Sequence, residues 1–460
     1  MSAANEAGTA RQLDRGIYLG YALGSVGTGI YNTVPGLLLL FYMTNTLGIS
    51  AWLAGLAIFV PKLWDVVTDP WMGSISDRSH SRWGRRRPWL LLGGLTLPAL
   101  FAAMFMTPDF ADPMLRFAWV FGFYVLCASA YTVFSVPYIA MPAEMTEDYH
   151  ETTTLMAWRM AALTVGVLVS GALAPVLVEK VGGGGRAGYA TMAMIIGLVL
   201  GAAMVGTFFG TRRAPQRERT LEAPPFWSTF GQALRVKPFA ILTVGYFFQH
   251  AGVGAVLAVV PYFATYVLEG DKLTLTIMFV CLVGPAFAAM PLWVALSKRI
   301  GKLHGYIASM LLFGGFGASL WFARPDMVGL VYVQVALMGV GWAGTELFPF
   351  SMLPDVITAD RETSGQRREG LFTGLWMAID KGALAIGALC ASLVLDASGF
   401  IESEPGEIVT QPASALTGIS IGTALLPAIF VVISLPIVRR YSLARETNRD
   451  QPRESAQEQA

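Results

Sequence analysis

The sequence predicts an all-α membrane protein with twelve transmembrane helices. Of its 460 residues, 54% are hydrophobic and 14% are charged, whereas roughly 25% are charged in an ordinary soluble domain. Long apolar runs recur along the chain, and a helix needs about 20 mostly apolar residues to cross the hydrocarbon of a bilayer. These runs are too long and too continuously apolar for the roughly ten-residue alternating strands of a membrane barrel.

Twelve segments satisfy this length requirement. Their expected limits are 17–43, 51–76, 89–107, 116–143, 157–180, 187–211, 238–267, 273–297, 304–323, 328–353, 370–396 and 414–438. The polar residues before the first segment contain no apolar core of a secretory signal, so we expect no cleaved signal peptide. In the first segment, a face for close helix packing is predicted by Gly20, Gly24, Gly27 and Gly29.

The distribution of basic residues predicts the orientation in the membrane. Lys and Arg concentrate in alternate connections, above all 77–88 and 212–237, which places these connections and both termini on the cytoplasmic side. The basic residues of the opposite side are few: Arg116, Lys180, Arg186, Lys272 and Arg324. The net charge is only +1, so we expect no nucleic-acid partner. The expected location is a cell membrane, of the bacterial inner-membrane type, with lipid around the helices.

The connections also predict two halves. The Pro-containing basic linker 212–237 separates six spans from six, and the basic turn 77–88 after the second span recurs at 298–302 after the eighth. Such a recurrence favours parallel six-helix repeats, the organisation of major-facilitator transporters, although any cytoplasmic loop tends to be basic. We therefore predict a tail (1–16), a six-helix bundle (17–211), the linker (212–237), a second bundle (238–440) and a polar tail (441–460).

Two carboxylates lie inside the apolar second span. Asp65 and Asp69 are four residues apart, so they share one face of a helix, and Lys62 lies on the same side one turn earlier. Charge inside a membrane helix is costly and usually marks an ion or substrate pathway. The pair can hold a monovalent cation or a proton; the alternative is a structural cluster in which Lys62 neutralises one carboxylate.

Other ionisable residues fall within predicted spans. Arg159 begins the fifth span, Glu346 lies in the tenth, and Asp380 and Lys381 are adjacent in the eleventh. Lys381 can reach the aspartate pair of the second span or a bound substrate, and Arg159 can bind substrate or anchor the helix at the interface. Glu346 has a gating or a structural role, and the question of function also stays open for Asp380. His250 is either a packing histidine or, less often, a proton relay.

Uncharged polar residues complete the candidate cavity. Asn32, Thr132, Ser135 and Gln249 lie within spans one, four and seven and can face a common cavity. Trp64 and Trp376 are candidates for stacking on a sugar ring.

A longer motif surrounds the aspartate pair of the second span. Its residues are Lys62-Leu63-Trp64-Asp65, Asp69-Pro70, Met72-Gly73, Asp77-Arg78 and Ser81-Arg82-Trp83-Gly84-Arg85, with 131–138 in the fourth span and 365–369 before the span that contains Lys381. These motifs resemble the glycoside–pentoside–hexuronide:cation symporter family. The resemblance implies a major-facilitator fold that couples Na⁺, H⁺ or Li⁺ to inward movement of a sugar. It also implies a cation site formed by Asp65, Asp69 and Thr132, with Ser135 at the position of the family's acidic residue on helix four.

The departures from the family pattern bear on the substrate. Ser135 replaces one carboxylate, and the acidic position of helix one falls near Ser25 and Val26, so two acidic groups of the sugar site are absent. Because Arg159 and Lys381 are retained, an anionic sugar such as a hexuronide fits this site. A neutral glycoside held by amide and hydroxyl groups, or an amphiphile of the lysophospholipid type, is an alternative.

Together these features predict a symporter working by alternating access. Its substrate site is expected to include Asn32, Arg159, Gln249, Trp376 and Lys381. A cytoplasmic latch is expected from Asp77, Arg78, Arg82 and Arg85, pairing with acids such as Asp77, Glu147, Asp148 or Asp355; the alternative is simple topological charge. We expect a monomer without a cofactor other than the coupling ion, and no enzyme, because no nucleophile–base pair is apparent. Competing functions are a proton-driven exporter and a non-transporting membrane sensor.

Overall fold

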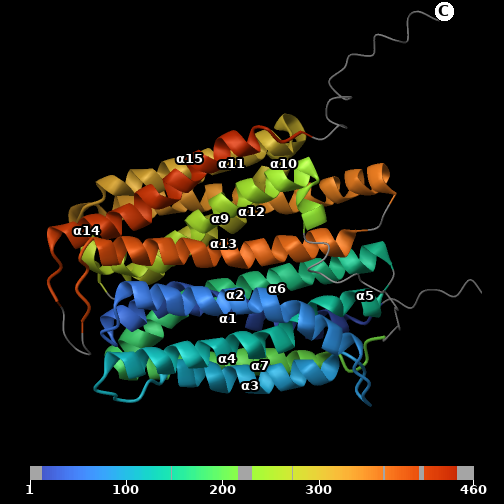
Figure 1. Ribbon diagram of the computed structural model, residues 1–460, viewed down its shortest axis with the longest axis horizontal. Helices are drawn as coiled ribbons and strands as arrows, with labels where there is room; N and C mark the ends of the chain where they lie inside the picture. The colour runs from blue at the N-terminus through green and yellow to red at the C-terminus, as the bar shows by residue number, and fades with distance from the viewer. Residues whose placement is uncertain are drawn as a thin grey trace, which may run out of the picture. The chain divides into compact units, whose positions relative to one another are not determined.

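The computed structural model describes residues 13–146, 148–215, 231–271, 273–365, 368–403 and 409–442. Across these ranges the chain is helical and contains no strand (Figure 1). Most of the predicted tails and of the linker 212–237 lies outside the described residues, as does Glu147. Twelve helices in the described part are long and apolar enough to cross a membrane, which confirms the predicted fold class.

The first six spans are built from seven α-helices and one π-helix. They are α1 (Arg15–Asn45), α2 (Ala51–Asp77), α3 (Arg87–Phe105), α4 (Pro113–Ala140), the short α5 (Pro142–Met145), α6 (Tyr149–Val176) with its π-helical continuation η1 (Leu177–Val181), and α7 (Gly185–Gly210).

The second six spans follow the same scheme with more interruptions. They are α9 (Lys237–Tyr262) with η2 (Phe263–Val267), α10 (Thr274–Ile300), α11 (Lys302–Ser319) with η3 (Leu320–Phe322), η4 (Pro325–Met327) with α12 (Val328–Ser364), α13 (Glu369–Ala397), and α14 (Ala413–Ser420), η5 (Ile421–Leu425) and α15 (Leu426–Val438) forming the last span.

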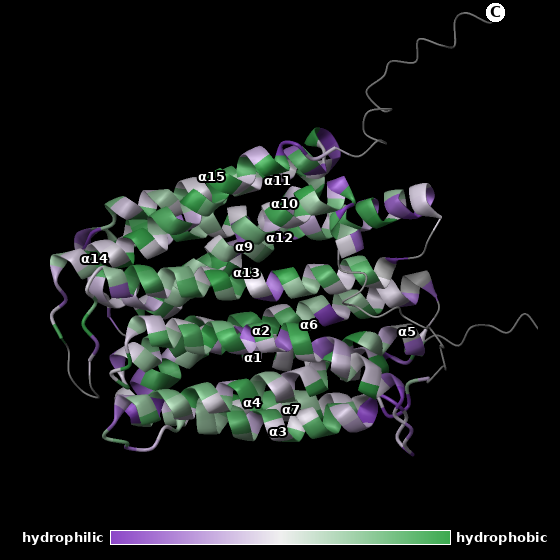
Figure 2. Cartoon of the chain, viewed as in Figure 1, coloured by the Kyte–Doolittle hydropathy of each residue, from purple (hydrophilic) through white to green (hydrophobic). Residues whose placement is uncertain are grey.

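Hydrophobic residues run along most of each helix, and hydrophilic residues gather at the helix ends (Figure 2). Two helices extend well beyond the expected spans. The helix of the fifth span begins at Tyr149 rather than at 157, and the tenth span covers Pro325–Ser364 rather than 328–353. A helix can continue through polar residues beyond its apolar run. At the start of α6, for example, Asp148 caps the helix by accepting a hydrogen bond from the Glu151 amide at 2.8 Å.

The chain divides into two compact units. Unit 1 comprises Met1–Pro35, Val67–Asp109 and Ala118–Leu221, and unit 2 comprises Gly36–Val66, Phe110–Phe117 and Glu222–Ala460. Helices α1, α2 and α4 therefore contribute residues to both units. The expected bundles 17–211 and 238–440 stay a prediction.

Glycine allows close helix packing in unit 1. A methyl group at Gly20 would lie 2.6 Å from the backbone of Gly210 on α7, and one at Gly29 would lie 2.6 Å from the Leu163 carbonyl on α6. Real Cβ atoms essentially never come so close, so α1 meets these neighbours backbone to backbone. The predicted glycine face of α1 thus packs against two neighbouring helices, α7 and α6.

In unit 2, α9 is a central helix. It packs along α13 and α15 and also touches α12 (Figure 1). Polar side chains of α9 are buried with its apolar ones, including Gln249 and His250. A helix surrounded in this way must find partners for its polar groups within the unit.

Candidate functional site

The first carboxylate of α2 is fully buried. Asp65 is 0% exposed, and the Lys381 ammonium of α13, in the same unit 2, lies 3.8 Å from its Oδ2. An opposite charge at this distance lowers the cost of holding a carboxylate inside a membrane helix. Of the two partners expected for Lys381 from the sequence, the structure places it beside an aspartate of the second span.

The second carboxylate of α2 contacts a hydroxyl in unit 1. Thr132 of α4 is buried and donates from Oγ1 to Asp69 Oδ1 at 2.8 Å. Thr68 in turn donates to Thr132 Oγ1 at 3.5 Å, and Ser135 is buried one turn further along α4. Carboxylate and hydroxyl oxygens are the kind of ligand that hard cations prefer.

Helical geometry sets the spacing of the two carboxylates. Asp65 and Asp69 belong to one uninterrupted α-helix, so their Cα atoms are separated by about 6 Å along its axis. One of them is next to a cation and the other next to a hydroxyl, so the two are not equivalent. This asymmetry was not predictable from the spacing alone.

Arg159 lies on α6 beside aromatic and hydroxyl groups of unit 1. Its guanidinium carbon is 5.9 Å from the centre of the Tyr138 ring, within the range of a cation–π contact. Its Nη1 is 3.9 Å from the sulfur of Met156. Within the described part of the chain Arg159 has no carboxylate partner, and its buried Nε has no hydrogen-bond partner.

The neighbouring hydroxyls are well ordered by hydrogen bonds. Tyr138 donates to the Tyr21 carbonyl at 2.8 Å, so the Ser25 hydroxyl, 2.7 Å away, donates to Tyr138. The acidic helix-one position of the family pattern was expected near Ser25 and Val26. The region around Arg159 thus combines one cation with fixed, neutral hydroxyl groups.

The other predicted substrate residues are distributed over both units. In unit 1, Asn32 is exposed and donates to the Thr28 carbonyl at 3.0 Å and to the Tyr131 hydroxyl at 3.2 Å. In unit 2, Gln249 is 0% exposed, and neither amide atom has a hydrogen-bond partner among the residues described. Trp376 is buried with one face stacked on Tyr246, 4.5 Å between ring centres, whereas Trp64 is exposed.

The structure also gathers three residues that the sequence left separate. The imidazole of His250 on α9 lies 3.2 Å from a carboxylate oxygen of Glu346 on α12 and 3.2 Å from one of Asp380 on α13, all in unit 2. Sequence reasoning missed this cluster because its members come from three different helices, whose packing no local pattern gives. The signal available was the presence of three ionisable residues in apolar runs.

The basic turn after α2 forms an ion-pair network in unit 1. Arg85 Nη2 and Arg86 Nε each lie 2.9 Å from Glu144 Oε1. Arg86 also reaches Asp77 Oδ1 at 2.5 Å and Ser76 Oγ at 2.6 Å. We call Asp77, Arg85, Arg86 and Glu144 the arginine network.

Two of the four predicted latch residues lie in this network. Asp77 and Arg85 belong to it, whereas Arg82 lies over the Trp83 ring at 4.9 Å and Arg78 is exposed. Sequence reasoning missed Arg86 and Glu144, although Glu144 closely follows the end of α4. In unit 2, Lys302 pairs with Asp355 at 2.5 Å.

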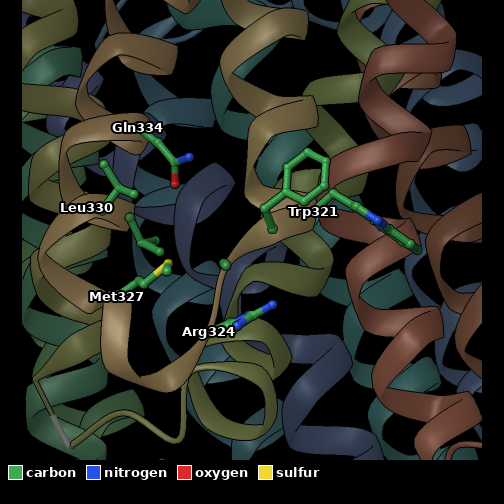
Figure 3. A pocket seen from close by; sticks show the side chains of 8 residues that line it. Trp321, Arg324, Met327, Leu330 and Gln334 are labelled. Carbon is green, nitrogen blue, oxygen red and sulfur yellow. The ribbon is translucent and has the colours of Figure 1, made fainter.

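One cavity, of about 350 Å³, lies away from these residues, where α11 ends and α12 begins (Figure 3). It is lined by Trp321, Phe322, Ala323, Arg324, Met327, Leu330, Val331 and Gln334. None of the predicted site residues is among them.

Twelve apolar spans that carry buried charges define a multi-pass membrane protein of the transporter class. The chain belongs to the MFS/sugar transport protein family, which matches residues 20–445. This finding confirms the family expected from the motifs of α2.

Relatives agree with this assignment. A putative glycoside/cation symporter of Escherichia coli is 27% identical, with 91% of this chain and 90% of the relative covered. The glucuronide carrier protein homolog of Escherichia coli is 25% identical, covering 94% and 93%. Among solved structures, a bacterial homologue of the human lysosomal transporter Spinster is similar in fold, with a TM-score of 0.66, 13% identity, and 92% and 95% covered.

Proposed function

We propose that this protein is a secondary active transporter that couples entry of Na⁺ or H⁺ to uptake of a sugar or glycoside. The observation that carries this proposal is the contact of Asp69 with the Thr132 hydroxyl, one turn from the buried Asp65 on the same helix. The carboxylate and hydroxyl oxygens of Asp69 and Thr132 would bind the cation, with Ser135 nearby. Asp65, which lies beside Lys381, would respond to the charge of the bound cation.

The cation supplies the driving force. Moving one positive charge inward through 100 mV releases about 2.3 kcal/mol, which supports roughly fifty-fold accumulation of a co-transported substrate. In alternating access, two six-helix halves rock about a midplane site, with both termini in the cytoplasm. The arginine network would hold the cytoplasmic ends of unit 1 together in one state. No covalent chemistry is needed, and a monomer suffices.

The proposed substrate is an anionic sugar. Arg159 has no carboxylate partner among the residues the structure describes, and its guanidinium carbon lies 5.9 Å from the centre of the Tyr138 ring, whose hydroxyl is hydrogen-bonded to Ser25. An arginine offers a planar, two-point contact to a carboxylate, and hydroxyl groups can bind sugar hydroxyls. One relative is named a glucuronide carrier protein homolog, and a glucuronide is an anionic sugar.

Transport by purified protein in liposomes tests the proposal. With a Na⁺ or H⁺ gradient, wild-type protein is expected to accumulate a glucuronide, whereas Asp69→Asn loses accumulation but keeps substrate counterflow. Asp326→Asn is the matched control, because Asp326 is exposed in η4. Full accumulation by Asp69→Asn would overturn the cation site, and export driven by a proton gradient in inverted vesicles would identify an exporter instead.

A further inference from the structure

A cluster of ionisable side chains lies within unit 2, and the proposed cation and sugar sites use none of its members. His250 Nδ1 is 3.2 Å from Glu346 Oε1, and His250 Nε2 is 3.2 Å from Asp380 Oδ1. Only 8% of the His250 side chain is exposed, against 23% for Glu346 and 22% for Asp380. We call these three residues the histidine cluster.

Each carboxylate of the histidine cluster accepts a further hydrogen bond. The Tyr246 hydroxyl donates to Asp380 Oδ1 at 2.5 Å, and the Trp342 indole donates to Glu346 Oε1 at 3.1 Å. The Tyr246 ring also stacks on the imidazole, with ring centres 4.8 Å apart and planes at 20°. Two hydrogen bonds and one ring stack therefore hold the cluster in place.

The helices around α9 bring few other ionisable groups to the cluster. From α11, Tyr306 interacts electrostatically with Glu346. From α13, Lys381 follows Asp380, and its ammonium lies 3.8 Å from Asp65. The segment α15, which also packs on α9, contains no titratable residue. The charges that face His250 within the described chain are thus the two carboxylates.

A neutral imidazole does not satisfy this arrangement. It carries a proton on only one of its two nitrogens, so the other nitrogen would present a lone pair to a carboxylate oxygen. With both carboxylates ionised, the cluster would also hold two negative charges in an apolar environment, which is costly. One additional proton makes both ring nitrogens donors, each facing one carboxylate, and halves that charge.

We propose that His250, Glu346 and Asp380 form a proton-binding site that takes up and releases one hydrogen ion. The proton belongs to the cluster as a whole, because ionisable groups in such close contact titrate together.

Helix α13 links this site to Asp65. Asp380 and Lys381 are consecutive, so their side chains point about 100° apart around the helix, one to His250 and the other to Asp65. A displacement of α13 alters both contacts, so proton binding and the Asp65–Lys381 pair influence one another reciprocally. This linkage rests on the proposed function, because it makes proton binding part of cation coupling; the proton site itself does not.

Nitrogen NMR of the imidazole tests the site directly. The chain has four histidines, so replacing His80, His150 and His304 by Gln leaves His250 as the one labelled ring, with the cluster unchanged. In lipid bilayers we expect both ring nitrogens to be protonated at low pH and one proton to leave between about pH 5 and pH 10. A ring with a single protonated nitrogen throughout that range would overturn the proposal.

Variants then assign the partners and the linkage. Glu346→Gln and Asp380→Asn are each expected to change the proton concentration at half-titration about tenfold or more, whereas the exposed control Asp326→Asn leaves it unchanged. An unchanged titration in both carboxylate variants contradicts the proposed site. Lys381→Gln is expected to change the proton concentration at half-titration about fivefold. If this variant leaves the titration unchanged, the linkage to Asp65 is contradicted. The titration uses no substrate and no ion gradient, so it succeeds or fails independently of the uptake assay.

Discussion

Charged groups in the spans are contacted differently within the two units. Within unit 1, Asp69 accepts from the Thr132 hydroxyl, and Arg159 lies over the Tyr138 ring. Within unit 2, Asp65 lies beside Lys381, and His250 lies between two carboxylates. Hydroxyl groups and rings stabilise a charge without cancelling it, whereas opposite charges cancel one another. Among the residues the structure describes, Arg159 of unit 1 therefore has no compensating carboxylate, whereas the charged side chains of unit 2 compensate one another.

The largest effect is expected from breaking a charge pair of unit 2. Lys381→Met removes the cation beside a buried carboxylate, and such a change costs about 3 kcal/mol in the free energy of unfolding. Thermal unfolding in detergent measures it as a lower Tm. The double variant Lys381→Met/Asp65→Asn is expected to recover most of the loss; if it is as unstable as Lys381→Met, the pair does not stabilise unit 2.

A substitution at Arg159 tests the other side of the comparison. Arg159→Gln is expected to weaken the binding of an anionic glycoside about thirtyfold, because loss of a charge partner costs about 2 kcal/mol. The variant is expected to leave Tm nearly unchanged, because no carboxylate loses its partner. Equilibrium binding of a glucuronide and of the corresponding neutral glycoside measures the difference. Arg159→Lys is the matched variant, which keeps the charge but loses the planar contact. Equal weakening of both sugars by Arg159→Gln would assign Arg159 a structural role.

A smaller effect is expected from the hydroxyl on Asp69. Thr132→Val keeps the shape of the side chain but removes its donor to the carboxylate, so we expect about a tenfold loss in affinity for the coupling cation. The Na⁺ concentration that half-activates uptake measures this affinity. Thr132→Ser retains the hydroxyl and is expected to remain close to wild type; a Val variant with wild-type Na⁺ dependence would exclude Thr132 from the cation site.

The smallest effect is expected at the exposed pair of unit 2. The side chains of Lys302 and Asp355 are 39% and 43% exposed, so Lys302→Gln is expected to cost less than about 1 kcal/mol. In the arginine network, Arg86 and Glu144 are only 10% and 12% exposed, and Arg86→Gln is expected to lower Tm more. The two Tm values, measured side by side, show whether burial or the mere presence of an ion pair matters.

Most of the fold was predictable from the sequence because a bilayer imposes a minimum apolar length on every span. The two large errors in helix limits, at Tyr149 and at Ser364, arose because helices continue through polar residues outside the apolar run. The aspartate pair was predictable because both residues lie on one helix, and the family resemblance pointed to Thr132. The contacts of His250 with Glu346 and Asp380, and of Arg86 with Glu144, depend on how separate helices pack, which no local pattern encodes.

The glycine contacts of α1 have a consequence for how freely this sequence can vary. Gly20 touches the backbone of Gly210, and Gly29 that of Leu163, so even an alanine would force these helices apart. In a library of random substitutions, functional variants are expected to carry few replacements at such positions, which form one stripe along the first helix. Lipid-facing positions such as Leu198, which is 75% exposed, are expected to accept many apolar residues. Substitutions that raise the stability of the protein are therefore best sought at these positions.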